Sequence, residues 1–349
     1  MLLQTDVLVI GSGVAGAMAL RKAQDRGLRT MGLTRGLGAS AYSSGKVDAF
    51  AISDEVQQAF LSLTQELRYL PSTLAVREDG HLVSAMLVQA SHFVDFDRVR
   101  PDSLVGVMDF SGMPSFHAAP VCRMLESHGF RAVPIRAAVS PQSGCWKSFR
   151  EFARAFEDPD FVDECLDKMV GALNLLPKKP AHVFVPAIFG SRDSPLVFLR
   201  SIQMRTDIPC SELLGASFSI PGVRLSQILE RGFERAKVAR FELKDGKIER
   251  VRLSDGRVVE PKALILATGR YLSGGFEDQE AIFELPIVGD SFERQGLRVN
   301  ERQQPLDRFG RLFATNLFAA GSSIGGYDPK VDGGMARAMA SGYRAGELC

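Results

Sequence analysis

Residues 11–16 contain three glycines whose spacing can bind a dinucleotide. Gly11, Gly13 and Gly16 follow the pattern G-x-G-x-x-G. The first glycine of this pattern permits a tight turn, the second lets the backbone approach a pyrophosphate, and the third lets the following helix pack closely. The N–H groups and the dipole at the start of that helix attract the anion. We predict that this turn binds cofactor phosphates through Gly11, Ser12, Gly13, Val14, Ala15 and Gly16.

The segments on both sides of the turn match the elements that must position it. Residues 7–10 form a short apolar run typical of a strand, residues 17–26 have a helical pattern, and residues 28–33 indicate a second strand. This strand–turn–helix setting makes a dinucleotide site a far stronger prediction than the glycine pattern alone.

The end of the second predicted strand departs from the usual pattern. An acidic residue is expected there, roughly 20 residues after the glycines, to bind the ribose hydroxyls. This chain has Thr34, Arg35 and Gly36 instead. Thr34 can make one hydrogen bond to a ribose, whereas Arg35 favours a phosphate. The sequence therefore specifies the phosphate half of the site and leaves the adenosine half open.

Composition excludes several classes of protein. The 349 residues include 42 Lys and Arg against 41 Asp and Glu, so a general nucleic-acid surface is not indicated. The five cysteines form no C-x-x-C pair, which argues against a zinc or iron–sulfur site and favours free thiols in a reducing cytoplasm. The turn at Gly11 leaves no room for a secretory leader, and no apolar stretch of about 18 residues suggests a membrane span. We expect a cytoplasmic protein without a metal site.

The nucleotide-fold pattern returns in the C-terminal part of the chain. A helix is predicted from residue 220 to about 236, followed by two strands that flank an Asp245–Gly246 turn. Apolar strands at 263–267 and 316–320 each run into a glycine, and a small-residue helix is predicted over 335–347.

The middle of the chain lacks a simple strand–helix–strand rhythm. Proline-containing loops separate two strand-like pieces, at 104–108 and 183–186, and two helix-like pieces, at 118–128 and 161–175. We interpret this part as an inserted domain.

Ordered motifs along the chain carry a family resemblance. The chain resembles FAD-dependent oxidoreductases of the fumarate reductase type in three segments, which are the turn at 11–16, Ala267-Thr268-Gly269 and Ala320-Gly321-Ser322. A more specific resemblance is to the B subunits of anaerobic glycerol-3-phosphate dehydrogenases. The segments that carry it are 43–45 with Asp48, 108–110, 186–190, 222–225, 267–275 and 321–329.

This resemblance implies an α/β fold, Rossmann-like and FAD/NAD(P)-binding, with an inserted second α+β domain. Residues 1–65 and 215–349 would form the flavin-binding domain, and residues 66–214 would form a cap or a substrate- or partner-facing domain. The dinucleotide fingerprint favours FAD, whereas the B subunits of this family are usually associated with FMN.

The family also implies partners and an activity. The partners would be a second flavoprotein (the A subunit) and an iron–sulfur, membrane-associated protein (the C subunit). The complex of the three proteins would oxidise sn-glycerol 3-phosphate to dihydroxyacetone phosphate and pass electrons to quinone. The chain would then lie at the inner face of the cytoplasmic membrane through a partner. One alternative is a stand-alone fumarate reductase- or dehydrogenase-type flavoenzyme acting on another hydroxy acid or enoate. Another is a non-catalytic assembly subunit with a vestigial flavin site, which the departure at Thr34 motivates.

Further cofactor-binding residues are predicted at strand ends, at a helix start and in one loop. Backbone amides at such ends suit phosphate and flavin oxygens. The loop resembles the segment that lies beside the flavin ring in this family. The alternative interpretation is that it is an ordinary solvated loop. These residues are Thr34, Arg35, Ser43, Ser44, Gly45, Thr268, Gly269, Gly321, Ser322, Gly333 and Gly334.

Two residues are candidates for a catalytic role. A cation at Lys46 near the flavin would stabilise its reduced anion, although an exposed loop lysine explains Lys46 equally well. Arg270 can bind a phosphate or carboxylate, or pair with a nearby acid. None of the five histidines has a recognisable catalytic context, so the sequence does not identify a general base.

Overall fold

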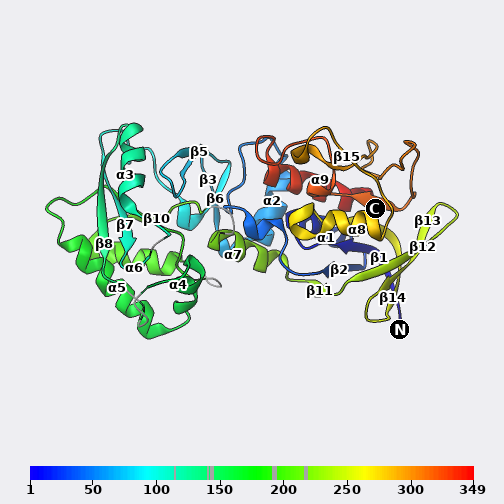
Figure 1. Ribbon diagram of the computed structural model, residues 1–349, viewed down its shortest axis with the longest axis horizontal. Helices are drawn as coiled ribbons and strands as arrows, with labels where there is room; N and C mark the ends of the chain where they lie inside the picture. The colour runs from blue at the N-terminus through cyan, green and yellow to red at the C-terminus, as the bar shows by residue number, and fades with distance from the viewer. Residues whose placement is uncertain (114, 140, 142–144, 191–194, 216–218) are drawn as a thin grey trace. The chain divides into compact units, whose positions relative to one another are not determined.

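The computed structural model describes residues 1–113, 115–139, 141, 145–190, 195–215 and 219–349. Its contacts divide the chain into two units (Figure 1). The first unit comprises Met1–Ser40, Asp48–Gln65 and Ser226–Cys349, and the second comprises Ala41–Val47 and Glu66–Leu225. Residues 41–47 and 215–225 thus group with the second unit, although the sequence-based division assigns them to the flavin domain. The roles predicted for the two domains remain predictions.

The first unit is built on a sheet with the strand order β11-β2-β1-β14-β13-β12, in which β17 also pairs with β14. Strands β11, β2, β1, β14 and β17 are parallel, and β12 and β13 form an antiparallel hairpin. The strands of this unit are β1 (Leu2–Ile10), β2 (Thr30–Thr34), β11 (Phe233–Arg235), β12 (Val238–Lys244), β13 (Lys247–Leu253), β14 (Val258–Leu266), β15 (Ile287–Val288), β16 (Gly296–Leu297) and β17 (Leu317–Ala319). Its helices are α1 (Val14–Asp25), α2 (Asp54–Leu63), α8 (Gly275–Ala281) and α9 (Gly334–Leu348). The predicted α/β, Rossmann-like fold is confirmed.

Strand β1 explains why the N-terminal apolar run has no polar alternation. Successive side chains of a strand point to opposite faces of the sheet. Val7 and Val9 pack with residues of α1 and α9 on one face, while Leu8 and Ile10 pack on the other face with a cluster that includes Phe283. A parallel strand covered on both faces must be apolar throughout.

Helices α1 and α9 approach each other closely through glycines of α9. A Cβ at Gly342 would overlap the carbonyl oxygen of Ala15, and a Cβ at Gly346 would overlap that of Ala19. The small residues noted in the sequence of α9 are therefore required by its packing. This contact holds α1, and with it the glycine turn, against the C-terminal helix.

We expect Gly342→Ala to destabilise the protein by about 1–3 kcal/mol, because the added methyl group forces two packed helices apart. A matched control is Gly171→Ala in α5 (Pro159–Asn174), where a Cβ would meet no described atom within 4 Å. That change should stabilise the protein by about 0.5–1 kcal/mol, because alanine is the better helix former. Urea unfolding of both variants checks the prediction, and equal effects would contradict the close packing.

One predicted helix boundary is wrong. Helix α7 (Ile220–Leu229) ends seven residues before the predicted limit, and Phe233–Arg235 form strand β11 beside β2. Gly232, with a φ of +87°, breaks the helix, and the Phe233 ring packs on Gly32 of β2. The predicted hairpin is confirmed, since Asp245 and Gly246 turn between β12 and β13 with positive φ values.

The second unit contains a four-stranded parallel sheet of order β10-β9-β7-β8 and two antiparallel strand pairs, β3-β6 and β4-β5. Its strands are β3 (Tyr69–Pro71), β4 (Leu74–Val76), β5 (Leu82–Ser84), β6 (Leu87–Gln89), β7 (Leu104–Phe110), β8 (Arg131–Ala137), β9 (His182–Val185) and β10 (Cys210–Glu212). Its helices are α3 (Ala118–Ser127), α4 (Phe149–Ala155), α5 and α6 (Leu196–Thr206), and α7 begins in it. Strands and helices alternate from β7 to β10, a rhythm that the sequence interpretation missed because it did not predict β8, which contains Pro134, or the three-residue β10. No helix within the described residues is long and apolar enough to cross a membrane.

Candidate functional site

The glycine turn joins β1 to α1, and the packing of the chain itself requires two of its three glycines. Gly11 has a φ of +111°, and a Cβ there would overlap the carbonyl oxygen of Ala267 at the end of β14. A Cβ at Gly16 would overlap the carbonyl oxygen of Gly11. These two positions therefore shape the turn and the close helix–strand contact, as the motif predicts.

Gly13 is different, because no described atom lies close enough to require a glycine there. Its backbone is extended, with φ −66° and ψ 178°, and it directly precedes the first residue of α1. The nearest described atom to a Cβ at this position would be Ser40 Oγ, at 3.5 Å, which is an ordinary contact. The first turn of α1 carries no acidic residue, and the N–H of Val14 donates to Ser40 Oγ, at 3.2 Å. The space over Gly13 and the start of α1 therefore suits a pyrophosphate.

The hydroxyl groups of Ser12 and Thr34 are bonded to each other. The distance between Ser12 Oγ and Thr34 Oγ1 is 2.7 Å, and both residues are buried. Thr34 Oγ1 also accepts the N–H of Gly36, at 3.2 Å. These bonds close the turn at the end of β2. The predicted bonds of Ser12 to a phosphate and of Thr34 to a ribose remain predictions. To make them, the two hydroxyls would have to break one or more of the hydrogen bonds described here.

Arg35 extends from the end of β2 to helix α8. Its Nη1 lies 2.6 Å from Oδ1 of Asp278, whose side chain is largely buried. Asp278 was not predicted from the sequence, and 243 residues separate it from Arg35 along the chain. The only indication in the sequence that an acid comes from elsewhere in the chain was the lack of one near Thr34.

Thr268 and Gly269 lie where β14 ends, next to the glycine turn. Thr268 Oγ1 accepts a hydrogen bond from Nε2 of Gln279, at 2.8 Å. The N–H of Gly269 donates to Ser323 Oγ, at 3.0 Å, and its φ of +76° favours glycine. The carboxyl end of a parallel strand is the expected edge for ligand binding in this fold.

Arg270 binds backbone carbonyl groups rather than an acid. Its guanidinium donates to the carbonyl oxygens of Ser322, at 2.8 Å, and Tyr327, at 3.0 Å, and also to that of Glu293. Burial lowers the pKa of Arg270. These contacts favour a structural role over the predicted catalytic one, because the charge already ties the end of β14 to the loop before α9.

Gly321 and Ser322 begin a short 3-10 helix after β17. Gly321 has a φ of +67°, and a Cβ there would lie 2.6 Å from the Cβ of Ala15 in α1. Its N–H donates to Ser341 Oγ, at 2.9 Å. The carbonyl of Ser322 accepts from Arg270. Gly321 is thus placed beside the N-terminal turn of α1, as expected for a residue near the cofactor.

The start of α9 already has acceptors for its first amides. Gly333 precedes the helix with a φ of +78°, and a Cβ there would lie 2.7 Å from the Phe50 side chain. The N–H of Gly334 donates to the carbonyl of Pro329, and that of Met335 donates to the Asp48 carboxylate, each at 3.0 Å. The predicted flavin contacts through Gly333 and Gly334 stay predictions, and Asp48 is an unpredicted anion at this helix start.

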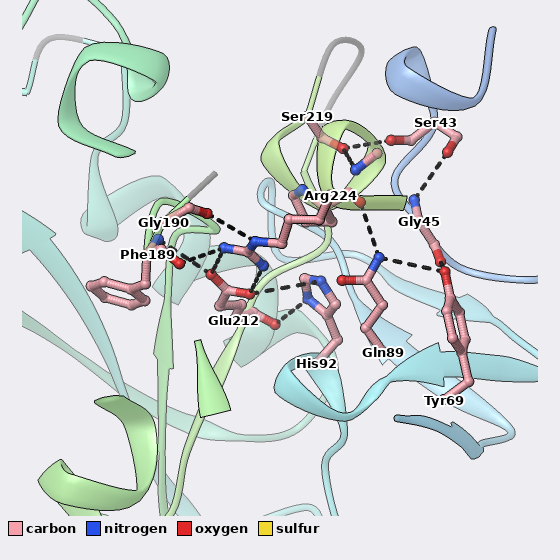
Figure 2. Close-up of polar contacts among 12 residues, drawn as sticks. Ser43, Gly45, Tyr69, Gln89, His92, Phe189, Gly190, Glu212, Ser219 and Arg224 are labelled. Carbon is pink, nitrogen blue, oxygen red and sulfur yellow. Dashed lines mark hydrogen bonds and ion pairs between the residues drawn. The ribbon is translucent and has the colours of Figure 1, made fainter. Parts of the chain in front are cut away.

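Ser43, Ser44, Gly45 and Lys46 belong to the second unit, so the predicted site residues are divided between the two units. Gly45 is buried and its three neighbours are half-buried, which does not fit a freely solvated loop. The carbonyl of Gly45 accepts from the Tyr69 hydroxyl, at 2.6 Å. Figure 2 shows this segment bonded through Ser43 to Ser219 and through Gly45 to Tyr69.

Comparison with known proteins identifies the cofactor. Residues 6–139 match the family described as FAD binding domain. The chain carries an FAD-binding domain. The matched residues include the glycine turn, β2 and the loop after it, and they continue into the second unit. The prediction of FAD is confirmed at the level of the domain.

The FAD-binding chain also has distant relatives that match it over nearly its whole length. These include the B subunit of anaerobic glycerol-3-phosphate dehydrogenase from Glaesserella parasuis serovar 5, which is 22% identical over 93% of each chain. The corresponding protein from Vibrio vulnificus (strain CMCP6) is 23% identical and covers 95% of this chain and 93% of its own length. Among solved structures, a 3-ketosteroid-delta4-(5alpha)-dehydrogenase from Rhodococcus jostii RHA1 is 11% identical with a TM-score of 0.36, covering 99% of this chain and 96% of the other.

The second unit of the FAD-binding chain holds a fully buried ion pair. Two bonds join the guanidinium of Arg224 to the carboxylate of Glu212, at 2.7 and 2.9 Å (Figure 2). Arg224 also donates to the carbonyls of Phe189, at 2.8 Å, and Gly190, at 2.9 Å. Burial opposes ionisation of Glu212, but the charge of Arg224 outweighs it and holds the pKa of Glu212 below its usual value. The pair thereby joins two of the segments that carry the family resemblance.

His92 adjoins this pair as a buried neutral ring. Its Nδ1 lies 2.9 Å from the carbonyl oxygen of Glu212, and since a carbonyl only accepts, Nδ1 carries the proton. Its Nε2 lies 3.9 Å from the Glu212 carboxylate. Burial lowers the pKa of His92. The ring is 2% exposed, so it supports the interior of the second unit rather than meeting a substrate.

His182 makes the stability of the second unit depend on pH. Its Nε2 lies 2.7 Å from Ser211 Oγ, and burial lowers the pKa of His182 from 6.5 to about 4. His182 is therefore protonated near pH 6.5 in the unfolded chain, but only near pH 4 in the folded chain. The folded state thus loses up to about 3 kcal/mol as the pH falls through that window.

We expect the urea midpoint to fall between pH 7 and pH 4.5, and to fall less steeply in His182→Gln. His92 contributes in the same direction, so a residual slope should persist. Identical slopes for the two proteins would contradict a neutral buried His182.

Proposed function

We propose that this chain is a flavoprotein subunit of a glycerol-3-phosphate:quinone oxidoreductase. The observation that carries the proposal is the length of the distant relationship. Similarity to three B subunits of anaerobic glycerol-3-phosphate dehydrogenase extends over 93–98% of this chain and 93–95% of theirs. A shared FAD-binding domain alone would leave most of the second unit unmatched.

The residues of the first unit fit FAD. Gly13 leaves room for the pyrophosphate at the start of α1, and α1 presents N–H groups and no acid there. Bound at this site, FAD would supply a two-electron acceptor, which is what oxidation of sn-glycerol 3-phosphate to dihydroxyacetone phosphate requires. The contribution of the chain is to bind and orient the dinucleotide.

The histidines support a division of labour within the complex. A general base must remove the hydroxyl proton of the substrate, and histidine is the usual choice. Two of the five histidines, His92 and His182, are buried with lowered pKa values. His81 pairs with Asp79, and His117 and His128 stand at the two ends of α3. Substrate oxidation is therefore assigned mainly to the partner flavoprotein, the A subunit, with this chain relaying electrons toward the iron–sulfur C subunit and quinone.

Co-expression of the chain with its genomic neighbours tests the proposal. Purification through a tag on this chain should recover a flavoprotein and an iron–sulfur protein, and sn-glycerol 3-phosphate should bleach the flavin absorbance of the complex. Enantiomeric sn-glycerol 1-phosphate serves as the control substrate. Absence of both partners together with an unbleached flavin would refute the proposal, and turnover of another hydroxy acid or enoate by the single chain would indicate a stand-alone flavoenzyme.

A further inference from the structure

The end of β2 is the place where a bound dinucleotide needs an acid and the sequence has none. The N–H of Gly11 donates to the carbonyl of Leu33, at 2.8 Å, so the end of β2 lies directly beside the glycine turn. The ribose next to the pyrophosphate is bound at this strand end by an acidic side chain in dinucleotide folds. Here the hydroxyl of Thr34 is buried and bonded to Ser12 and Gly36. Thr34 is therefore a poor substitute for the acid.

A carboxylate reaches this position from another part of the first unit. Asp278, in α8, places Oδ1 2.6 Å from Arg35 Nη1. Gly274, just before α8, lies beside this pair, since a Cβ there would be 3.4 Å from Nη1 of Arg35. Within the described part of the chain, Arg35 is the side chain that pairs with this carboxylate, so Oδ2 can accept further hydrogen bonds.

We propose that Asp278 replaces the missing acid of β2, and that its carboxylate accepts hydrogen bonds from the adenosine ribose hydroxyls of FAD. The same ion pair selects an unphosphorylated ribose. An arginine at this strand end ordinarily accommodates a 2′-phosphate. In this chain Asp278 neutralises Arg35, and its own charge repels a phosphate placed beside it.

The inference rests on the FAD-binding domain and does not depend on the substrate or partners proposed above. It concerns affinity for the adenosine half of the cofactor, which can be measured without turnover. Failure of the co-purification experiment would therefore leave it intact.

Titration calorimetry on the flavin-free full-length chain tests the proposal. The wild type should bind ADP about tenfold more tightly than 2′-deoxy-ADP, which is the effect of one charge-assisted hydrogen bond. Asp278→Asn should bind FAD and ADP about tenfold more weakly, should no longer distinguish ADP from 2′-deoxy-ADP, and should bind FMN as the wild type does. It should also bind adenosine 2′,5′-bisphosphate more tightly, because Arg35 is then free to meet the 2′-phosphate.

A matched control is Asp25→Asn, which breaks the Arg21–Asp25 ion pair of 2.8 Å on α1. Arg21 and Arg35 both have side chains that are 37% exposed, although Asp25 is 46% and Asp278 12% exposed, so the control matches the loss of an Asp–Arg pair and not its burial. This control should leave every affinity unchanged. The proposal is overturned if wild-type protein binds ADP and 2′-deoxy-ADP equally, or if Asp278→Asn weakens FAD and FMN alike. The wild-type comparison holds whatever the effect of the substitution on folding.

Discussion

Replacing Arg224 by methionine should lower the free energy of unfolding by about 3–5 kcal/mol, because the Glu212 carboxylate would remain buried without a counter-charge. Both side chains of the pair are 0% exposed, so water cannot take over the role of the arginine. The carbonyls of Phe189 and Gly190 would lose their donor as well. Urea unfolding at pH 7 measures the effect.

Two controls separate the buried charge from simple loss of packing. The double variant Arg224→Met with Glu212→Gln should be more stable than Arg224→Met alone, because neither charge is then left buried. Arg205→Met breaks the surface pair with Asp167, whose side chains are 49% and 72% exposed, and should cost less than about 1 kcal/mol. A double variant that is less stable than the single one would show that the charge of Glu212 is not the cause.

Replacing Gly13 by valine should reduce FAD affinity at least a hundredfold and leave the flavin-free protein folded. The backbone at Gly13 is extended and its nearest described neighbour would be 3.5 Å from the new Cβ, so the protein itself leaves room for that atom. The pyrophosphate does not, because it must approach this backbone. Fluorescence titration with FAD and the thermal midpoint of the flavin-free chain measure the two effects.

Gly16→Val provides the contrast. Its side chain would overlap the carbonyl of Gly11, so this variant should lose stability whether or not FAD is present. Gly13→Val with unaltered FAD affinity would mean that the cofactor does not approach this turn. Equal destabilisation by the two valines would mean that Gly13 serves the fold alone.

Short-range sequence patterns predicted those parts of the structure whose conformation depends on residues close together in the chain. Gly16 meets a local steric requirement, because a Cβ there would overlap the carbonyl of Gly11, and the hairpin at Asp245 and Gly246 has positive φ values that only certain residues adopt readily. The alternation of strands and helices between β7 and β10 escaped notice, because β10 has only three residues and β8 contains Pro134, which argues against a strand.

Long-range packing overrode the local pattern in β11. The helical pattern continues past Leu229, but Phe233–Arg235 instead pair with Gly32–Thr34, about 200 residues earlier. The Phe233 ring fits against Gly32, where there is no side chain. A local window contains none of this information.

The sequence by itself determined that a tight glycine turn joins β1 to α1, because Gly11 and Gly16 act through their own backbone. Tertiary structure alone decided which groups pair with the polar side chains of the first unit. It placed Asp278 on Arg35, bound Arg270 to backbone carbonyls, and set Asp48 at the start of α9. The physical reason is that a side chain chooses its partner by distance in space, and the chain brings together residues that are hundreds of positions apart.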